Sequence, residues 1–217
     1  MKNRIDIARV GVELTTIENL TQWRQTQDEE ELFTSLLILG NEVEEGDLYK
    51  LDITASKFER CRFLHCDFEK ASFVDVIFEN CDFSNSRFAG AYFSRCEFRN
   101  CKCLGTDFHE AVLKQVQMSD SVLRYGNFGG TLLENVFMEQ CDFMEASFSN
   151  MKHKKWSANK CQFIGTNFFR TFLRGFDFSE NEMADIIVSD KMEELKGCKI
   201  SPMQALEAAK LLDMQVV

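Results

Sequence analysis

Cysteine is the residue type in this chain whose spacing could do chemistry. Five of the nine cysteines lie at intervals of twenty or forty residues, and Ser121 fills the one gap in the series. These five are Cys61, Cys81, Cys101, Cys141 and Cys161. If residues twenty apart stack, their thiols form a column that could bind metal ions or be oxidised. A thiol also packs as a small apolar side chain, so the same column could be a structural filler. We favour the filler, because no Cys-x-x-Cys pair with zinc spacing is accompanied by histidines.

Other catalytic groups are sparse. The three histidines, His65, His109 and His153, are scattered along the chain. No phosphate-binding glycine loop, His-Glu-x-x-His motif or nucleophile elbow occurs. The sequence therefore predicts a protein without catalytic activity, metal or cofactor. Unpaired thiols in odd number and the lack of a signal peptide predict a cytoplasmic protein. No apolar run has the length of a membrane helix, so no membrane partner is expected.

The element that positions these residues is an internal repeat. From Phe33 to Val188 there are 32 positions at intervals of five residues, and all of them except His153 and Ala158 fit an apolar pattern. The residue two places earlier is nearly always small. A period of five fits neither a helix, with 3.6 residues per turn, nor a strand, with two. A repeat this short indicates a solenoid.

The repeat unit resembles that of the pentapeptide-repeat family, whose consensus is a small residue, Asp or Asn, Leu or Phe, and two variable polar residues. Clear units are Cys66-Asp67-Phe68-Glu69-Lys70 and Thr166-Asn167-Phe168-Phe169-Arg170. The resemblance implies an all-β fold, a right-handed quadrilateral β-helix with four repeats per coil. Residues twenty apart would then stack. The expected aromatic ladder is Phe68, Phe88, Phe108, Phe128, Phe148 and Phe168.

The chain is expected to have three parts. Residues 1–32 lack the repeat and are predicted to be an N-terminal cap with some helix, in which Asp28 to Glu31 opens a helix or forms an acidic turn. Residues 33–188 are the β-helix. Residues 189–217 form a C-terminal module in which Ser201 caps a helix, Pro202 takes its first position, and Met203 to Leu212 follow. Residues 198–200 and 214–217 are predicted as short strands.

This C-terminal module is similar to that of the Qnr and microcin-immunity branch of the family. The resemblance implies a homodimer about a two-fold axis. The expected dimer contacts are Met203, Leu206, Leu211, Leu212 and Val216. The regular repeat leaves no room for the projecting loops of Gram-negative Qnr proteins, so the chain resembles the loop-free, Gram-positive type.

Charge is unevenly distributed. The formal net charge is −10, and residues 28–47 hold eight acids and no base. Residues 48–188 hold 19 acids and 17 bases, so the rod itself is nearly neutral. A chain of this sign is not expected to bind nucleic acid directly.

The branch resemblance implies a protein that binds a type II topoisomerase, DNA gyrase or topoisomerase IV, imitates duplex DNA, and protects the enzyme from quinolones or peptide poisons. Carboxylates one residue before the apolar site would stand in for phosphates. They are Asp52, Asp67, Asp82, Glu97, Asp107, Asp142 and Asp177. These carboxylates could instead brace the turns of the coil. The alternative function is a β-helical scaffold for an unrelated protein partner, which the near-neutral rod favours.

One stretch departs from the repeat without changing its phase. It contains Lys152, His153, Lys154, Lys155 and Trp156. A distorted, basic and aromatic coil could be a partner-contact patch. The alternative is a coil that is repacked around Trp156, with Ala158 making room.

Overall fold

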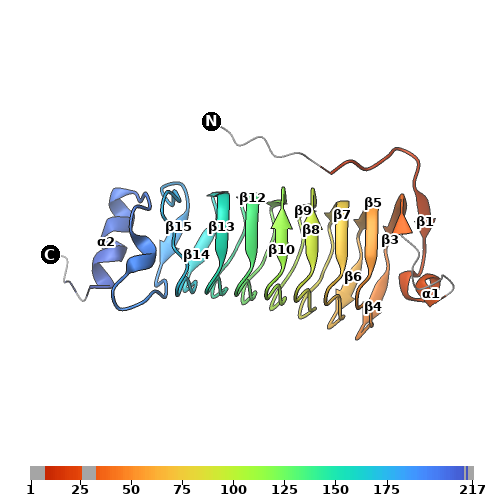
Figure 1. Cartoon of the computed structure of the whole chain (residues 1–217), viewed down its shortest axis with the longest axis horizontal. Coiled ribbons are helices and arrows are strands. Elements are labelled where there is room, and N and C mark those ends of the chain that lie inside the picture. Colours follow the sequence, from red (N-terminus) through yellow and green to blue (C-terminus); the bar gives the residue numbers. More distant parts are fainter. Residues whose placement is uncertain (1–7, 26–32, 213, 215–217) are drawn as a thin grey trace.

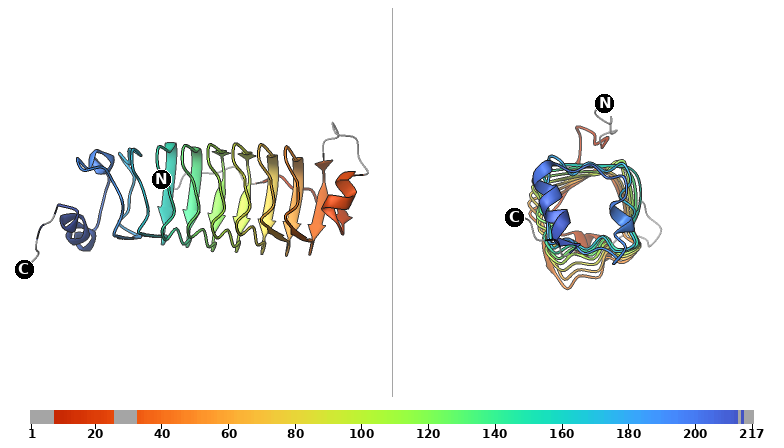
Figure 2. Two further views of the ribbon diagram at one scale, coloured as in Figure 1. Left: turned by 90° about the horizontal axis from the view of Figure 1, so that it is seen from below. Right: turned by 90° about the vertical axis from the view of Figure 1, so that its left-hand side faces the viewer.

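The chain folds into a rod. The computed structural model describes residues 8–25, 33–212 and 214, and within them fifteen short strands and three helical segments follow one another along the rod axis (Figure 1). Strands on neighbouring coils are parallel and pair with a spacing of twenty residues, as in Ser72 with Tyr92 and Val112 with Leu132. About eight such coils stack. The predicted right-handed quadrilateral β-helix is confirmed, and the end-on view shows its square outline (Figure 2).

Each coil has four sides, and we call the resulting surfaces of the rod faces A to D. Each face contains one inward residue from every coil, and these inward residues are twenty apart in sequence. Examples are Ile53 and Phe73 for face A, Phe58 and Phe78 for face B, Phe63 and Phe83 for face C, and Phe68 and Phe88 for face D. Faces A and C are opposite each other, as are B and D.

Strands lie mainly on three of the four faces. Face A carries β2 (Phe33–Thr34), β8 (Tyr92–Ser94) and β10 (Val112–Lys114), and face B carries β3 (Leu36–Leu39), β9 (Glu97–Arg99) and β11 (Gln117–Ser119). Long strands cover A and B together: β5 (Asp52–Glu59), β7 (Ser72–Glu79), β12 (Leu132–Glu139) and β13 (Lys152–Asn159). Face C has β4 (Glu42–Glu44), β6 (Arg62–Leu64), β14 (Gln162–Ile164) and β15 (Glu182–Ala184). Face D is joined by single bridges such as Asp67 with Arg87.

The corners of the coil require an unusual backbone conformation. The second residue after each inward side chain commonly has positive φ, for example Lys70 at 58° and Asn150 at 55°. This left-handed region is unfavourable for most residues. Here it turns the amide of Lys70 toward the carbonyl oxygen of Ala89 on the next coil, at 2.9 Å. The regular hydrogen bond between coils offsets the local cost.

Phenylalanine fills the axis of the rod. Phe68, Phe88 and Phe108 are fully buried and stack with ring centroids 4.7 and 5.3 Å apart. The stack continues to Phe128, Phe148 and Phe168 at 4.9, 4.7 and 5.7 Å. The aromatic ladder predicted from the twenty-residue spacing is therefore confirmed.

The N-terminal end of the rod is covered by β1 (Thr15–Ile17) and α1 (Leu20–Gln25). β1 pairs with β3, while Ile17 and Leu20 are buried in the core. The Asn41 side chain joins the two elements: it donates to the Ile17 carbonyl at 3.1 Å and accepts from the Leu20 amide at 2.6 Å. The Asp28–Glu31 stretch lies outside the described residues.

Residues 8–14 run back from β1 alongside the rod (Figure 1). The amide of Arg9 donates to the Asp75 carboxylate at 3.1 Å, and that of Ala8 donates to Glu97 at 3.2 Å. The segment thus lies along the corner between faces A and B. Sequence reasoning did not anticipate this arm.

The C-terminal end differs in detail from the prediction. A helical turn, η1 (Glu193–Leu195), is followed by α2 (Pro202–Lys210), with Ser201 as N-cap. In place of a strand at residues 198–200, only Lys199 forms a bridge, to Asp177. Met214 is not in a strand, and the rest of 214–217 lies outside the described residues. The spacing of 22 between Asp177 and Lys199 shows that two extra residues end the regular register.

Candidate functional site

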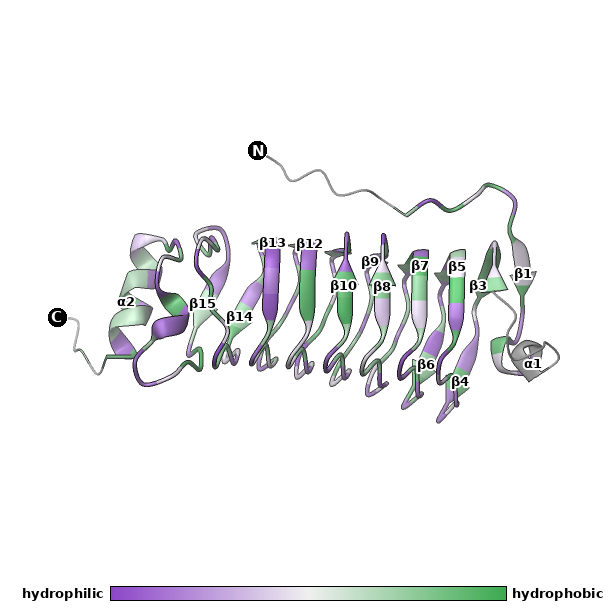
Figure 3. Ribbon diagram, in the orientation of Figure 1, coloured by the Kyte–Doolittle hydropathy of each residue, from purple (hydrophilic) through white to green (hydrophobic). Residues whose placement is uncertain are grey.

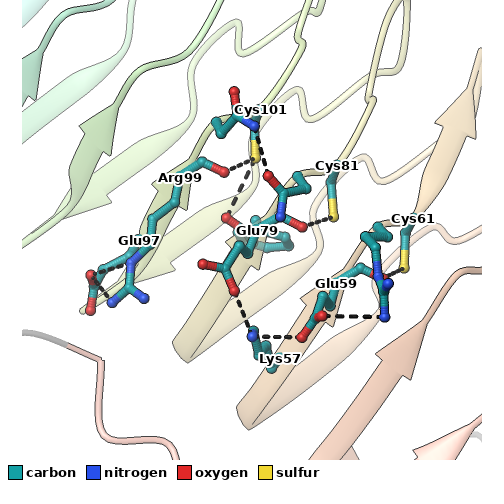
Figure 4. Close-up of polar contacts among 12 residues, drawn as sticks. Lys57, Glu59, Cys61, Glu79, Cys81, Glu97, Arg99 and Cys101 are labelled. Atoms are coloured by element: carbon teal, nitrogen blue, oxygen red, sulfur yellow. Dashed lines mark hydrogen bonds and ion pairs between the residues drawn. The ribbon is translucent and has the colours of Figure 1, made fainter.

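The cysteine column forms as the spacing predicts. Cys61, Cys81 and Cys101 lie one above another on successive coils (Figure 4). Each thiol donates to a backbone carbonyl oxygen: Cys61 to Ile38 at 3.1 Å, Cys81 to Glu79 at 3.4 Å, and Cys101 to Phe78 at 3.4 Å. The thiols therefore act as hydrogen-bond donors to the backbone of the coil.

Hydroxyl groups make the same kind of hydrogen bond at equivalent positions of the repeat, two residues before the large inward side chain. Thr106 donates to the Phe83 carbonyl and Thr166 to the Phe143 carbonyl, both at 2.9 Å. Ser121, which fills the gap in the column, donates to the Ser119 carbonyl at 2.8 Å. Where Cys, Ser or Thr occupies this position of the repeat, its side chain therefore donates to a backbone carbonyl oxygen. In the part of the chain that the structure describes, no three His, Cys, Asp or Glu side chains are grouped to hold a metal ion.

Thiol reactivity tests this interpretation. Eight cysteines are buried and Cys198 is half-buried, and burial raises the pKa of Cys96 to about 12. A thiol reacts as its thiolate, so we expect Ellman's reagent to label Cys198 fastest and the other eight only after unfolding. Rapid labelling of the Cys61–Cys81–Cys101 column in the native protein, or a disulfide within it, would contradict this. A Cys198→Ser variant is the control.

The seven candidate carboxylates do not form one stripe. Their numbering places Asp52 on face A, Glu97 and Asp177 on B, Asp82 and Asp142 on C, and Asp67 and Asp107 on D. Five of them accept a hydrogen bond from the amide two residues later, at 2.8 to 3.0 Å: Asp67, Asp82, Asp107, Asp142 and Asp177. This is the Asx-turn geometry that braces a backbone turn. Bracing is thus one role of these five.

Glu97 differs from the other six, because its side chain is buried. It pairs with Arg99 at 2.6 Å and receives the amide of Ala8 from the N-terminal arm. Its carboxylate is therefore not presented to a partner as a phosphate would be, which corrects the expectation for this residue. Asp52 is exposed near the start of face A.

Ion pairs between adjacent coils neutralise much of the outer surface. Lys57 lies between Glu59 and Glu79 on face B, at 2.6 Å from each (Figure 4). On face C, Lys102 pairs with Asp82 at 3.1 Å. Burial alone would raise the pKa of Asp82, but the hydrogen bonds from Ser84 and Lys102 outweigh it and hold the pKa below its ordinary value. The spacing of twenty between Asp82 and Lys102 is the sequence signal that could have revealed their pair.

The exposed acidic side chains of face C are concentrated at its two ends. Its first coil exposes Glu42, Glu44 and Glu45, and its last coils expose Glu145, Glu182 and Asp185. Between them stand Arg62, the Lys102–Asp82 pair and the Arg124–Asp142 pair, the last at 2.6 Å. Face C is acidic at both ends and mixed in the middle, so its negative charge is not continuous.

The repeat-breaking stretch forms a regular strand. β13 pairs with β12 in the normal register, from Leu132 with Lys152 to Glu139 with Asn159. The Trp156 side chain points inward, is only 6% exposed, and packs 4.2 Å from Phe176 and 5.5 Å from Phe148. Trp156 is therefore part of the core and not of a surface patch.

The three lysines of this stretch are exposed. Lys152, Lys154 and Lys155 give β13 a hydrophilic colour along most of its length, beside the apolar segment of β12 (Figure 3). His153 is half-buried, with its Nε2 atom 2.8 Å from the Phe172 carbonyl oxygen. Of the five predicted patch residues, the lysines are those available to a partner.

Helix α2 and the turn after it direct apolar side chains outward. Met203 and Leu206 of the helix are 73% and 40% exposed, and Leu212 of the turn is 54% exposed. Leu211 packs partly against the core, and Val216 lies outside the described residues. The buried side chain of the helix is Gln204, which donates to the carbonyls of Phe178 at 2.7 Å and Asn181 at 2.6 Å. Sequence reasoning missed this anchor because a glutamine carries no burial signal.

Comparison with known proteins agrees with this geometry. A family model described as a pentapeptide repeat region matches residues 51–128 and 91–168, which together cover more than half of the chain. The chain belongs to the pentapeptide-repeat family. No curated protein sequence matches it. The family model that matches describes a repeat region and indicates no catalytic family.

Solved pentapeptide-repeat structures resemble this one in fold. A trypsin-treated variant of QnrB1, described as a plasmid-mediated fluoroquinolone resistance protein, aligns with a TM-score of 0.54 and 20% identity, over 94% of this chain and 99% of that one. HetL from the cyanobacterium Nostoc sp. strain PCC 7120, described as involved in heterocyst differentiation regulation, aligns with a TM-score of 0.48 and 15% identity, over 87% of this chain and 90% of that one.

Among the described residues, no helix is long and apolar enough to cross a membrane.

Proposed function

We propose that this chain is a non-catalytic scaffold that binds a protein partner through its outer faces. The observation that carries the proposal is the division of the coil: phenylalanine, cysteine and other small residues fill the inside, and the charged groups stand outside in columns twenty residues apart. A rigid rod with defined columns of charge can match a complementary protein surface. The pentapeptide-repeat fold supports this role.

Two charge variants test the scaffold role by affinity capture of partners. One removes acids from face C, Glu145→Gln/Glu182→Gln/Asp185→Asn, and the other removes the lysines of β13, Lys152→Ala/Lys154→Ala/Lys155→Ala. All six residues are exposed, so both variants should fold. We expect one of them to lose a protein that the wild type retains. Identical capture by all three proteins would contradict binding through these faces.

A second candidate is protection of a type II topoisomerase, DNA gyrase or topoisomerase IV, by DNA mimicry. It is supported by the carboxylates at both ends of face C and by the likeness to QnrB1, a fluoroquinolone resistance protein. The ion pairs in the middle of face C favour the scaffold instead.

A gyrase supercoiling assay with ciprofloxacin separates the two candidates. If the chain is a topoisomerase protector, adding it from nanomolar to micromolar concentration should restore supercoiling, and the face C variant should restore less. If cognate gyrase is neither rescued nor inhibited, the topoisomerase candidate is wrong. The scaffold proposal then stands on the capture experiment alone.

The exposed stripe of α2 supports a homodimer as part of this proposal. Met203, Leu206 and Leu212 would cover one another across a two-fold axis, which removes apolar surface from water. We expect light scattering after size exclusion to give about twice the chain mass of 25.1 kDa. Leu206→Lys should convert the dimer to monomer, and the exposed substitution Lys160→Gln should not. A wild-type monomer at high concentration would rule the dimer out.

A further inference from the structure

The C-terminal half of face A has a charge opposite to that of the chain. Its four coil sides, residues 111–115, 131–135, 151–155 and 171–175, contain five bases and one acid. The bases are Lys114, Lys152, Lys154, Lys155 and Arg174, and the acid is Glu134, which pairs with Lys154 at 3.4 Å. We call this surface, together with Leu132 and Phe172, the lysine face.

Apolar side chains stand within this basic surface. Leu132 is 38% exposed and Phe172 is 65% exposed, and Lys152 lies between them in the same column on successive coils. Stacked coils are about 4.8 Å apart, so the three side chains span roughly 10 Å. Lys154 and Arg174 form a parallel column beside them, two residues further along each coil side. The lysine face therefore offers an apolar strip flanked by cations.

Neither the fold nor the core requires this arrangement. Outward positions of the repeat accept any polar residue, and the same coil sides nearer the N-terminus hold Asp52, and Asp75 paired with Arg95 at 2.6 Å. The lysines are exposed to solvent, so water screens their mutual repulsion. Their clustering therefore does little to the stability of the free protein. Their charge is thus available for binding.

We propose that the lysine face binds an acidic segment of a partner protein that also carries apolar side chains. Carboxylates of the segment would pair with the cations, and its apolar side chains would cover Leu132 and Phe172. Face B, which adjoins face A, holds an excess of acids, including Glu139, Asp177 and Glu180. A nucleic acid or an anionic membrane extends over a wide area and meets these acids, whereas a peptide covers one face. The inference rests on the proposed scaffold role and adds the chemistry of the partner.

Synthetic 20-residue peptides test the proposal, with fluorescence anisotropy on the full-length protein. One peptide contains only glutamate, and the other interleaves glutamate with leucine. We expect the Glu/Leu peptide to bind at least fivefold more tightly. Lys152→Glu/Lys154→Glu/Lys155→Glu should weaken its binding at least tenfold. The matched control, Lys50→Glu/Arg60→Glu/Lys70→Glu, makes the same change of charge at exposed positions on other faces and should leave binding within twofold.

The apolar strip has its own variant. Leu132→Ser/Phe172→Ser should remove the preference for leucine and leave the weaker binding of the all-glutamate peptide unchanged. Circular dichroism establishes that each variant is folded. Equal affinity for the two peptides, loss of binding in the control variant, or tighter binding of duplex DNA or phosphatidylserine vesicles would overturn the proposal. Failure of these peptides to bind contradicts the lysine face alone, because capture through face C is measured separately.

Discussion

Phe88→Ala should destabilise the rod by about 3–5 kcal/mol, the usual cost of truncating a fully buried phenylalanine. Phe88 is fully buried in a central coil, and its ring stacks on those of Phe68 and Phe108. In a solenoid each coil contacts only its neighbours, so a cavity here weakens both adjoining interfaces. Urea unfolding, followed by circular dichroism, measures the change.

Two further substitutions serve as controls for the stability change of Phe88→Ala. Phe88→Leu keeps the large apolar side chain that the repeat allows at Leu113 and Leu123, and should cost less than about 1.5 kcal/mol. Phe172→Ala, at a side chain that is 65% exposed, should change stability by no more than about 0.5 kcal/mol. If Phe88→Ala costs as little as Phe172→Ala, the aromatic ladder is not what stabilises the rod.

Gln204→Ala should release helix α2 from the end of the rod. The substitution leaves the carbonyl oxygen of Asn181 without its donor and removes the side-chain acceptor for the Ser201 amide. The Phe178 carbonyl oxygen loses one of its two donors and keeps the Asn181 amide at 2.7 Å. Each buried group left unpaired costs about 1–3 kcal/mol, so the local loss is large relative to a nine-residue helix. Hydrogen exchange of residues 201–212 should rise sharply, while that of the central coils stays unchanged.

The matched variants at this position separate its two roles. Gln204→Glu retains an acceptor for Ser201 but brings a carboxylate against the two carbonyls, so it should release the helix as Gln204→Ala does. Lys210→Gln, at an exposed position on the same helix, should leave exchange unchanged. If α2 remains protected in both Gln204 variants, the apolar contacts of Leu211 hold the helix instead.

Much of the fold follows from local pattern. A large apolar residue at every fifth position and a small one two places earlier are sufficient to predict the coil, the pairing of residues twenty apart and the stacking of Phe68 through Phe168. The same periodicity predicts the cysteine column. The Ser201–Pro202 pair correctly places the start of α2, because capping depends on residues adjacent in sequence.

The outer surface could not be predicted as fully, because its properties depend on which side chains become neighbours. Sequence order groups Asp52, Asp67, Asp82 and Glu97 as equivalent positions of one motif, and the square coil distributes them over four different faces. Only the folded chain shows that Lys57 lies between Glu59 and Glu79 and that the N-terminal arm covers Glu97. The proposed binding faces are therefore tertiary features.

The sequence by itself determined the solenoid, its repeat length and the contents of its core, because each repeat buries its residues by a rule that needs only neighbouring coils. Tertiary structure decided three further points: Trp156 packs inside, α2 is anchored by Gln204 with its apolar stripe outward, and five bases of different coils form one face. The physical reason is that none of these side chains follows the periodic rule. Trp156 occupies an inward position that the rule gives to a small residue, Gln204 lies beyond the last repeat, and outward residues such as the five bases obey no periodic constraint.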